Sequence, residues 1–209
     1  LTLTLQGEEA IELWHDEGKK EGLIHGDTSA ALYRFALWMG LGLMVAPYDT
    51  VAIHSSCIVY QGKAVLFLGE SGTGKSTHTR LWQEHIEGTT LLNDDSPFLR
   101  VEDGKVWAYG SPWSGKTPCY RNESAPLAGM VRLKQAPQNR FAAKEDIEAF
   151  SLLLPGCSVL RQDKRLHEAL CMTLVALADM TCVGEMECLP DKEAAEVCRG
   201  EVLKDIRCI

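Results

Sequence analysis

Residues 69–76 read GESGTGKS and contain the side chains best suited to chemistry in this sequence. They match the pattern G-x-x-x-x-G-K-[ST], whose glycines let consecutive backbone N–H groups face a bound phosphate. In that pattern the lysine, here Lys75, reaches the β- and γ-phosphates, and the hydroxyl of Ser76 is a ligand for Mg²⁺. We therefore predict a loop that binds ATP and Mg²⁺, made of Gly69, Glu70, Ser71, Gly72, Thr73, Gly74, Lys75, Ser76 and Thr77.

Two adjacent carboxylates follow the short apolar run 90–92. They are Asp94 and Asp95, and ligands in open α/β sheets bind beyond the carboxyl ends of strands. Phosphoryl transfer needs a Mg²⁺ ligand and a group that accepts the proton of the acceptor hydroxyl. We assign Asp95 to Mg²⁺ together with Ser76, and Asp94 as the catalytic base. The structural alternative is a simple turn, because aspartate is common in turns.

A second candidate loop reads GSPWSGK at residues 110–116. Its alternative is a structural turn around a buried tryptophan. The residues that we expect to contact the acceptor are Ser111, Trp113, Ser114 and Lys116. Farther along, Arg161 and Arg165 are candidates to donate to the γ-phosphate in the transition state.

The elements that position these residues follow from apolar periodicity. Residues 64–68 form an apolar run directly before the phosphate-binding loop, typical of a buried strand. The dipeptides at 61–62 (Gln-Gly) and 103–104 (Asp-Gly) predict tight hairpin turns. Further strands are predicted at the start of 1–13 and at 51–60, 63–68, 90–92, 98–102, 105–109, 128–133 and 183–189. Helices are predicted at 78–87, 144–154, 165–180 and 191–198, and from a cap at 27–29 to 45. Residues 16–26 and 136–140 are predicted to be loops.

Length and composition limit the class of protein. The chain has 209 residues, 45% of them hydrophobic and 24% charged, as in an ordinary globular domain. We predict a single domain with a lead and helix at 1–49, a nucleotide-binding core at 50–135, and C-terminal helices and a strand at 136–209. The net charge of −8 argues against nucleic acid as the main partner, because an acidic surface repels phosphate backbones.

The cysteines and the N-terminal residues bear on location. None of the eight cysteines is part of a C-x-x-C pair, so we expect reduced thiols and no zinc site. Residues 1–10 lack a basic segment followed by an apolar one, and the apolar stretch 35–46 is too short to span a bilayer. We therefore expect a cytoplasmic protein without a membrane partner. Because the sequence begins with Leu1, we also expect it to start inside a longer protein.

The phosphate-binding loop, the aspartate pair and His54, fifteen residues before Gly69, together resemble the catalytic domain of the HPr serine kinase family. A more distant resemblance is to the nucleotide site of phosphoenolpyruvate carboxykinases. The resemblance implies an α/β fold with a mixed β-sheet, of the HPr kinase/phosphoenolpyruvate carboxykinase type, and a homo-oligomer. It also implies that His54 acts at the site, that one aspartate accepts the proton, and that the other holds the metal.

The sequence differs from HPr kinases in two features that bear on which acceptor is phosphorylated. Thr77 stands where many HPr kinases have an acidic residue, and the later arginine-bearing phosphorolysis signature is absent. We therefore predict an ATP- and Mg²⁺-dependent kinase that phosphorylates a hydroxyl of a protein serine or of a small molecule, with Asp94, His54 and Lys75 as catalytic residues. The alternatives are a nucleotide sensor without turnover and a carboxykinase-like lyase.

Overall fold

A computed structural model describes residues 2–5, 11–16, 21–27, 31–115, 117–157 and 163–204. The strands in these ranges are β1 (Thr2–Leu5), β2 (Ile11–His15), β3 (Gly22–His25), β4 (Thr50–Ala52), β5 (Ser55–Tyr60), β6 (Lys63–Leu68), β7 (Thr90–Asn93), β8 (Phe98–Glu102), β9 (Lys105–Tyr109), β10 (Ser124–Gln135), β11 (Arg140–Lys144) and β12 (Cys182–Cys188). The α-helices are α1 (Ala31–Val45), α2 (Lys75–His85), α3 (Asp146–Leu153), α4 (Lys164–Met180) and α5 (Lys192–Val202). None of these helices has the length and apolar character needed to cross a bilayer.

The predicted mixed α/β class is confirmed. Within the described ranges, one nine-stranded sheet has the order β4-β8-β9-β10-β6-β5-β7, and β12 and β11 extend it beside β10. Strand β10 pairs in parallel with both β6 and β12, whereas β5–β6 and β8–β9 are antiparallel hairpins. Because β10 pairs with β12, the predicted segments 50–135 and 136–209 share one sheet.

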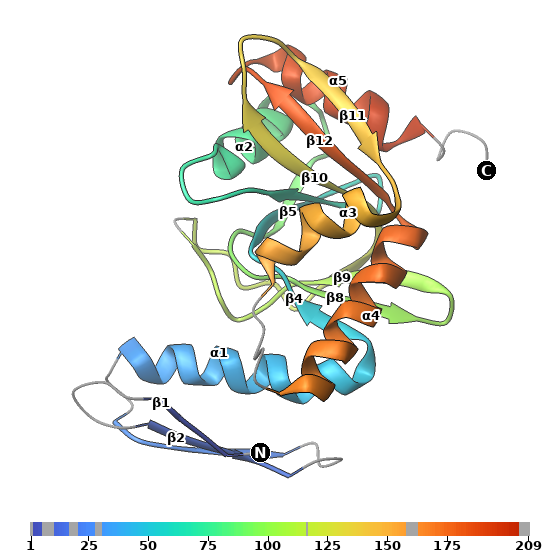
Figure 1. The fold of residues 1–209 in the computed structure, drawn as a ribbon. Helices are drawn as coiled ribbons and strands as arrows, with labels where there is room; N and C mark the ends of the chain where they lie inside the picture. The colour runs from blue at the N-terminus through green and yellow to red at the C-terminus, as the bar shows by residue number, and fades with distance from the viewer. Residues whose placement is uncertain are drawn as a thin grey trace.

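Helices cover both faces of the central strands (Figure 1). On β6, Leu66 and Leu68 face a core that includes α3 and α4, while Val65 and Phe67 face a core that includes α2 and α5. All four side chains are buried. Burial on both faces explains why this strand is a continuous apolar run without alternation.

The strands around the phosphate-binding loop converge at one edge. The β5–β6 hairpin turns at Gln61 and Gly62, both with positive φ (49° and 72°), as a two-residue hairpin requires. Its register pairs Ser55 with Leu68, and β7 pairs with β5 in the antiparallel direction. The amino end of β5 therefore meets the carboxyl ends of β6 and β7, which precede Gly69 and Asp94.

The N-terminal residues form a smaller sheet with the order β1-β2-β3. This sheet and α1 make up the lower part of the molecule in Figure 1. Gly40 of α1 allows a close approach, because a Cβ at that position would lie 2.5 Å from Leu13 Cδ1. Trp38 Nε1 donates to Ser96 Oγ at 2.9 Å, so α1 is also attached to the segment that follows the aspartate pair.

Several predicted boundaries were wrong because pairing over long sequence distances decides them. Residues 16–26 contain β3, which pairs with β2. The predicted strand 51–60 is broken before Ser55, because β4 pairs with β8 while β5 pairs with β6 and β7. Strand β11 was missed, and β10 is longer than predicted. Both predicted hairpins and the predicted helices were confirmed apart from their ends.

Candidate active site

The loop between β6 and α2 has the backbone that its glycines permit. Gly69, Gly72 and Gly74 have φ values of 149°, 86° and 107°, a region that favours glycine. A Cβ on Gly69 would also lie 2.4 Å from Thr73 Oγ1. The loop ends at the N-terminus of α2, whose first turn contains no acidic residue. Free N–H groups and the helix dipole therefore favour an anion at this point.

Lys75 lies over the loop. Its Nζ donates to the carbonyl oxygens of Gly69 at 2.8 Å and of Glu70 at 3.1 Å. Burial lowers the pKa of Lys75, and the neighbouring carboxylates of Asp94 and Asp95 oppose that shift. The ammonium group is thus held between the loop and the aspartate pair, where a phosphate on the loop would meet it.

Asp94 is the aspartate next to the loop hydroxyl. Ser76 Oγ donates to Asp94 Oδ1 at 3.4 Å, and the backbone N–H of Thr117 donates to Asp94 Oδ2 at 3.3 Å. The side chain of Asp94 is buried. A hydroxyl and a carboxylate are oxygen ligands, which Mg²⁺ prefers.

Asp95 lies beside the histidine. His54 Nδ1 is 3.5 Å from Asp95 Oδ1, and the backbone N–H of Ser55 donates to the carbonyl of Asp95 at 3.0 Å. Both side chains are partly exposed. The neighbours of the two carboxylates are therefore the reverse of those expected, since we expected Asp95 to lie beside Ser76.

Asn93 explains this arrangement, and sequence reasoning gave it no role. Its Oδ1 accepts from the backbone N–H groups of Asp95 and Ser96, both at 2.9 Å. Its Nδ2 donates to Ser111 Oγ at 3.1 Å and to the carbonyl of Trp113 at 3.0 Å. The buried amide thereby turns the chain after β7 and joins it to residues 110–119, which follow β9 and are called the 110–119 loop from here on. An asparagine directly before Asp-Asp was the available signal for such a turn.

The 110–119 loop uses its hydroxyl groups to hold its own shape. Ser111 is buried, and its Oγ accepts from the backbone N–H of Trp113 at 3.3 Å as well as from Asn93. Ser114 Oγ donates to the carbonyl of Thr117 at 2.6 Å and accepts from the N–H of Cys119 at 2.9 Å. Lys116 lies outside the described residues. A role for this loop in contacting the acceptor stays a prediction.

Arg132 is a further cation at the site that was missed. Strand β10 places it in register with Leu68, the last residue of β6 before the loop. Its charge contributes to the lowered pKa of Lys75, and its Nη1 donates to the carbonyl of Leu152 at 3.1 Å. The sequence feature that could have indicated its role was a single arginine within the apolar strand predicted at 128–133. Of the expected arginines, Arg161 is not among the described residues, and Arg165 lies in the first turn of α4.

Comparisons with known proteins give a distant structural similarity and no sequence match. No protein-family model matches the chain, and no curated protein matches it. Among solved structures, the chain is similar to the HPr(Ser) kinase/phosphatase from Coxiella burnetii, with a TM-score of 0.42 and 11% identity over 75% of this chain and 95% of that one. A likeness this distant supports no functional step.

A cavity of ≈ 550 Å³ adjoins the loop on the side of α2. Gln135, at the end of β10, forms part of it and donates from Nε2 to the carbonyl of Gly72 at 3.3 Å. The other lining residues include Thr77, Leu81 and Leu189. Its size is within the range of small-molecule pockets, and it is next to the end of the phosphate-binding loop.

Gly115 offers a test of the contact between the 110–119 loop and Asp94. A Cβ at this position would lie 2.4 Å from the backbone oxygen of Asp94, so Gly115→Ala must displace the loop or the aspartate. Since a shift of about 1 Å in a catalytic group can cost about 10²-fold in rate, we expect Gly115→Ala to lower any ATP turnover at this site by a factor of that order. Turnover and thermal unfolding would be measured together.

Gly42→Ala is the matched control, because a Cβ at Gly42 meets no atom within 4 Å. This helical substitution should leave turnover unchanged and stabilise the fold by up to about 1 kcal/mol. Full turnover in folded Gly115→Ala would contradict the proposed dependence of Asp94 on the loop.

Proposed function

We propose that this chain is a kinase that transfers the γ-phosphate of ATP to a hydroxyl group, with Mg²⁺ bound. The observation that carries the proposal is the meeting of four groups at one sheet edge: the loop with Lys75, the Ser76–Asp94 pair, the His54–Asp95 pair and Arg132. Phosphoryl transfer requires little beyond positioned charges, a metal site and a proton acceptor.

Each group has a role that its position supports. The loop N–H groups bind the phosphates, and Lys75 exchanges its two carbonyl acceptors for phosphate oxygens. Ser76 and Asp94 would hold Mg²⁺, which neutralises charge on the β- and γ-phosphates when bound. The cavity beside Thr77 would receive the nucleoside.

The pair of His54 and Asp95 is suited to proton transfer. Asp95 is more exposed than Asp94, and its carboxylate can reach an incoming hydroxyl. Nδ1 of His54, as a donor, would hold that carboxylate in one orientation. We therefore assign Asp95 as the base and Asp94 as the metal ligand, with their roles exchanged relative to the sequence-based assignment.

The test is an assay with the purified chain, Mg²⁺ and γ-labelled ATP. It is run against an array of serine-containing peptides and a panel of hydroxylated metabolites. We expect Mg²⁺-dependent ATP binding and labelled phosphate on one acceptor class. If ATP binds but no labelled phosphate is transferred to an acceptor or released into solution, the result would contradict the kinase proposal and favour a nucleotide sensor.

Arg132→Lys tests the second cation. Arginine can donate two parallel hydrogen bonds to phosphate oxygens, whereas lysine is a point charge. We expect kcat to fall by about 10²-fold with little change in ATP affinity, because removing one such donor has an effect of that size in the transition state. Arg140→Lys is the control, because the Arg140 side chain on β11 is 67% exposed, and it should change neither quantity. An equal loss of binding and turnover would contradict a transition-state role.

A further inference from the structure

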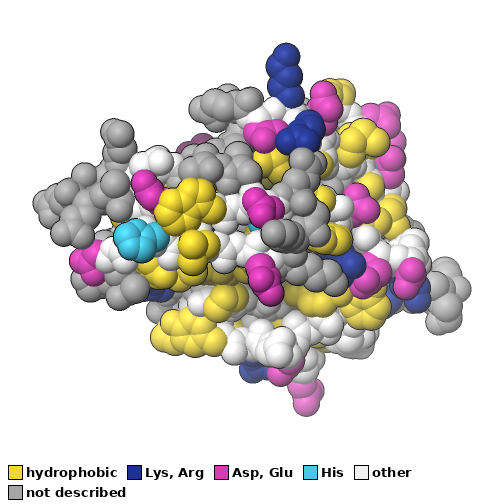
Figure 2. Space-filling model, turned by 90° about the horizontal axis from the view of Figure 1, so that it is seen from below, with side chains coloured by type: hydrophobic (Ala, Val, Ile, Leu, Met, Phe, Trp, Pro, Cys, Tyr) yellow, Lys and Arg dark blue, Asp and Glu magenta, His cyan; other side chains and the backbone are white. Residues whose placement is uncertain are grey.

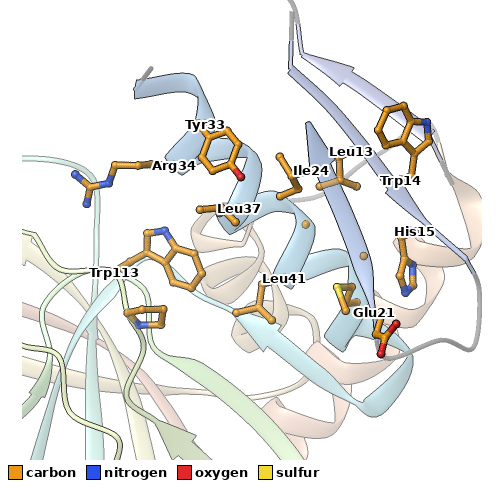
Figure 3. A pocket seen from close by; sticks show the side chains of 14 residues that line it. Leu13, Trp14, His15, Glu21, Ile24, Tyr33, Arg34, Leu37, Leu41 and Trp113 are labelled. Atoms are coloured by element: carbon orange, nitrogen blue, oxygen red, sulfur yellow. The ribbon is translucent and has the colours of Figure 1, made fainter. Parts of the chain in front are cut away.

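A second cavity lies between the N-terminal sheet, α1 and the 110–119 loop. It has a volume of ≈ 700 Å³ and is lined by residues of β2 and β3, by one side of α1, and by Pro112–Trp113 of the 110–119 loop (Figure 3). Its walls are mainly apolar, and they include Leu13, Ile24, Leu37, Leu41 and Met44. Figure 3 shows Leu37, Leu41 and the indole of Trp113 facing one another across it.

Strand β3 forms part of this wall and is the last strand of the small sheet as far as the described residues show. The small sheet has the order β1-β2-β3, so within the described residues no strand pairs with the outer edge of β3. Its sequence, Gly-Leu-Ile-His, contains none of the lysines or prolines that commonly protect such edges. Leu23 is also 61% exposed. A row of unpaired N–H and C=O groups accepts an extended chain as an added strand.

We propose that an extended segment of a partner polypeptide adds to β3 as a fourth strand and places alternate side chains in this cavity. The edge supplies the main-chain bonds, and the cavity supplies side-chain selectivity. A small apolar molecule would fill the cavity but leave the edge unpaired, so the two features together favour a peptide. The lower face seen in Figure 2 also exposes hydrophobic side chains between charged ones.

The dimensions and charges of the cavity define the segment. The lining runs along α1 from Tyr33 to Met44, or about 17 Å at ~1.5 Å per residue, the length of about five extended residues. Arg34 lies at one end of this stretch and Glu21 lines another part of the cavity near His15 (Figure 3). The segment would therefore carry apolar residues at alternate positions, with an acidic residue toward Arg34.

The cavity is connected to the candidate active site through the same loop. The carbonyl of Trp113 accepts from Asn93 Nδ2, and Thr117 of this loop bonds to Asp94. A docked segment would thus lie against a loop that holds the proposed metal ligand. The docking proposal itself does not depend on the kinase proposal, because neither the edge nor the cavity includes a nucleotide-binding residue.

The test uses the full chain without nucleotide and an array of decapeptides with alternating apolar residues. The best peptide is then titrated by calorimetry, and its copy with alternate N-methylated amides is compared. We expect saturable binding, and at least a tenfold weaker affinity after N-methylation, because N-methyl groups block strand pairing.

Leu37→Glu should weaken binding at least tenfold, since Leu37 lines the cavity and is 42% exposed, which lets the variant fold. Phe35→Glu is the matched control on the same helix: Phe35 is 46% exposed and is not among the lining residues. It should bind the peptide normally. ATP binding is measured in both variants to keep the two sites separate.

Three results would overturn the proposal: no peptide that binds, binding unaffected by N-methylation, or equal effects of the two substitutions. Binding of a fatty acid such as decanoate with no peptide binding would likewise overturn it in favour of a small-molecule pocket. Each of these results is independent of whether the chain binds ATP.

Discussion

Replacing Lys75 with alanine should weaken ATP binding by roughly 10²–10⁴-fold, because two charge-assisted hydrogen bonds to phosphate are lost and each contributes about 1.5–3 kcal/mol. The fold should survive. Among the described residues, the Lys75 Nζ donates to the carbonyls of Gly69 and Glu70, both in its own loop. Calorimetric titration with Mg·ATP would give the affinity, and thermal unfolding would report the fold.

Lys105→Ala provides the control for a general loss of positive charge. Lys105 is exposed at the start of β9. It should leave ATP affinity unchanged. A folded Lys75→Ala protein with wild-type ATP affinity would remove the basis for the phosphate-binding loop and for the function proposed from it.

Asp94→Asn should raise the Mg²⁺ concentration needed for ATP binding and abolish most turnover. Its Oδ1 is the oxygen next to Ser76, and a neutral amide is a weaker ligand for a hard cation than a carboxylate. The Mg²⁺ dependence of nucleotide binding is the deciding measurement, because loss of turnover alone does not separate a metal ligand from a base.

Asp95→Asn should retain Mg·ATP affinity and lose turnover by about 10²–10⁴-fold, the usual contribution of a general base. A matched His54→Gln variant, which keeps a donor near Asp95, should have a smaller effect on turnover. If Asp95→Asn rather than Asp94→Asn shifts the Mg²⁺ requirement, the two roles are those first assigned from the sequence. If neither variant affects turnover, the kinase proposal fails.

Local sequence patterns predicted the elements best where neighbouring residues decide the outcome. The hairpin at Gln61–Gly62 follows from glycine conformation, and the helix after the loop motif was predicted at 78–87 and is observed at Lys75–His85. Helix α5 begins after Asp191, whose carboxylate accepts from the N–H of Ala194. In contrast, β3 has little apolar pattern of its own, and it is a strand because β2 pairs with it.

In the candidate site, too, some residues follow from a local motif and others from contacts between distant segments. The loop residues could be named from one motif, but the neighbours of Asp94 and Asp95 depend on Asn93 and on a loop about twenty residues later. Arg132 is at the site through the register of β10 with β6, which no local pattern specifies. Contacts between distant segments therefore determine the features of the site that the sequence did not predict, namely the neighbours of the two aspartates and the position of Arg132.

The position of β12 has a consequence for synthesis on the ribosome. Strand β10 contains Met130, Val131 and Leu133, all buried, and β12 pairs with it from Gly129 to Gln135. Residues 136–181 must be made before that partner exists. At translation rates of about 5–20 residues per second, an apolar strand edge stays unpaired for about 2–9 s. During this interval the nascent chain is open to intermolecular strand pairing through the edge that β12 later covers.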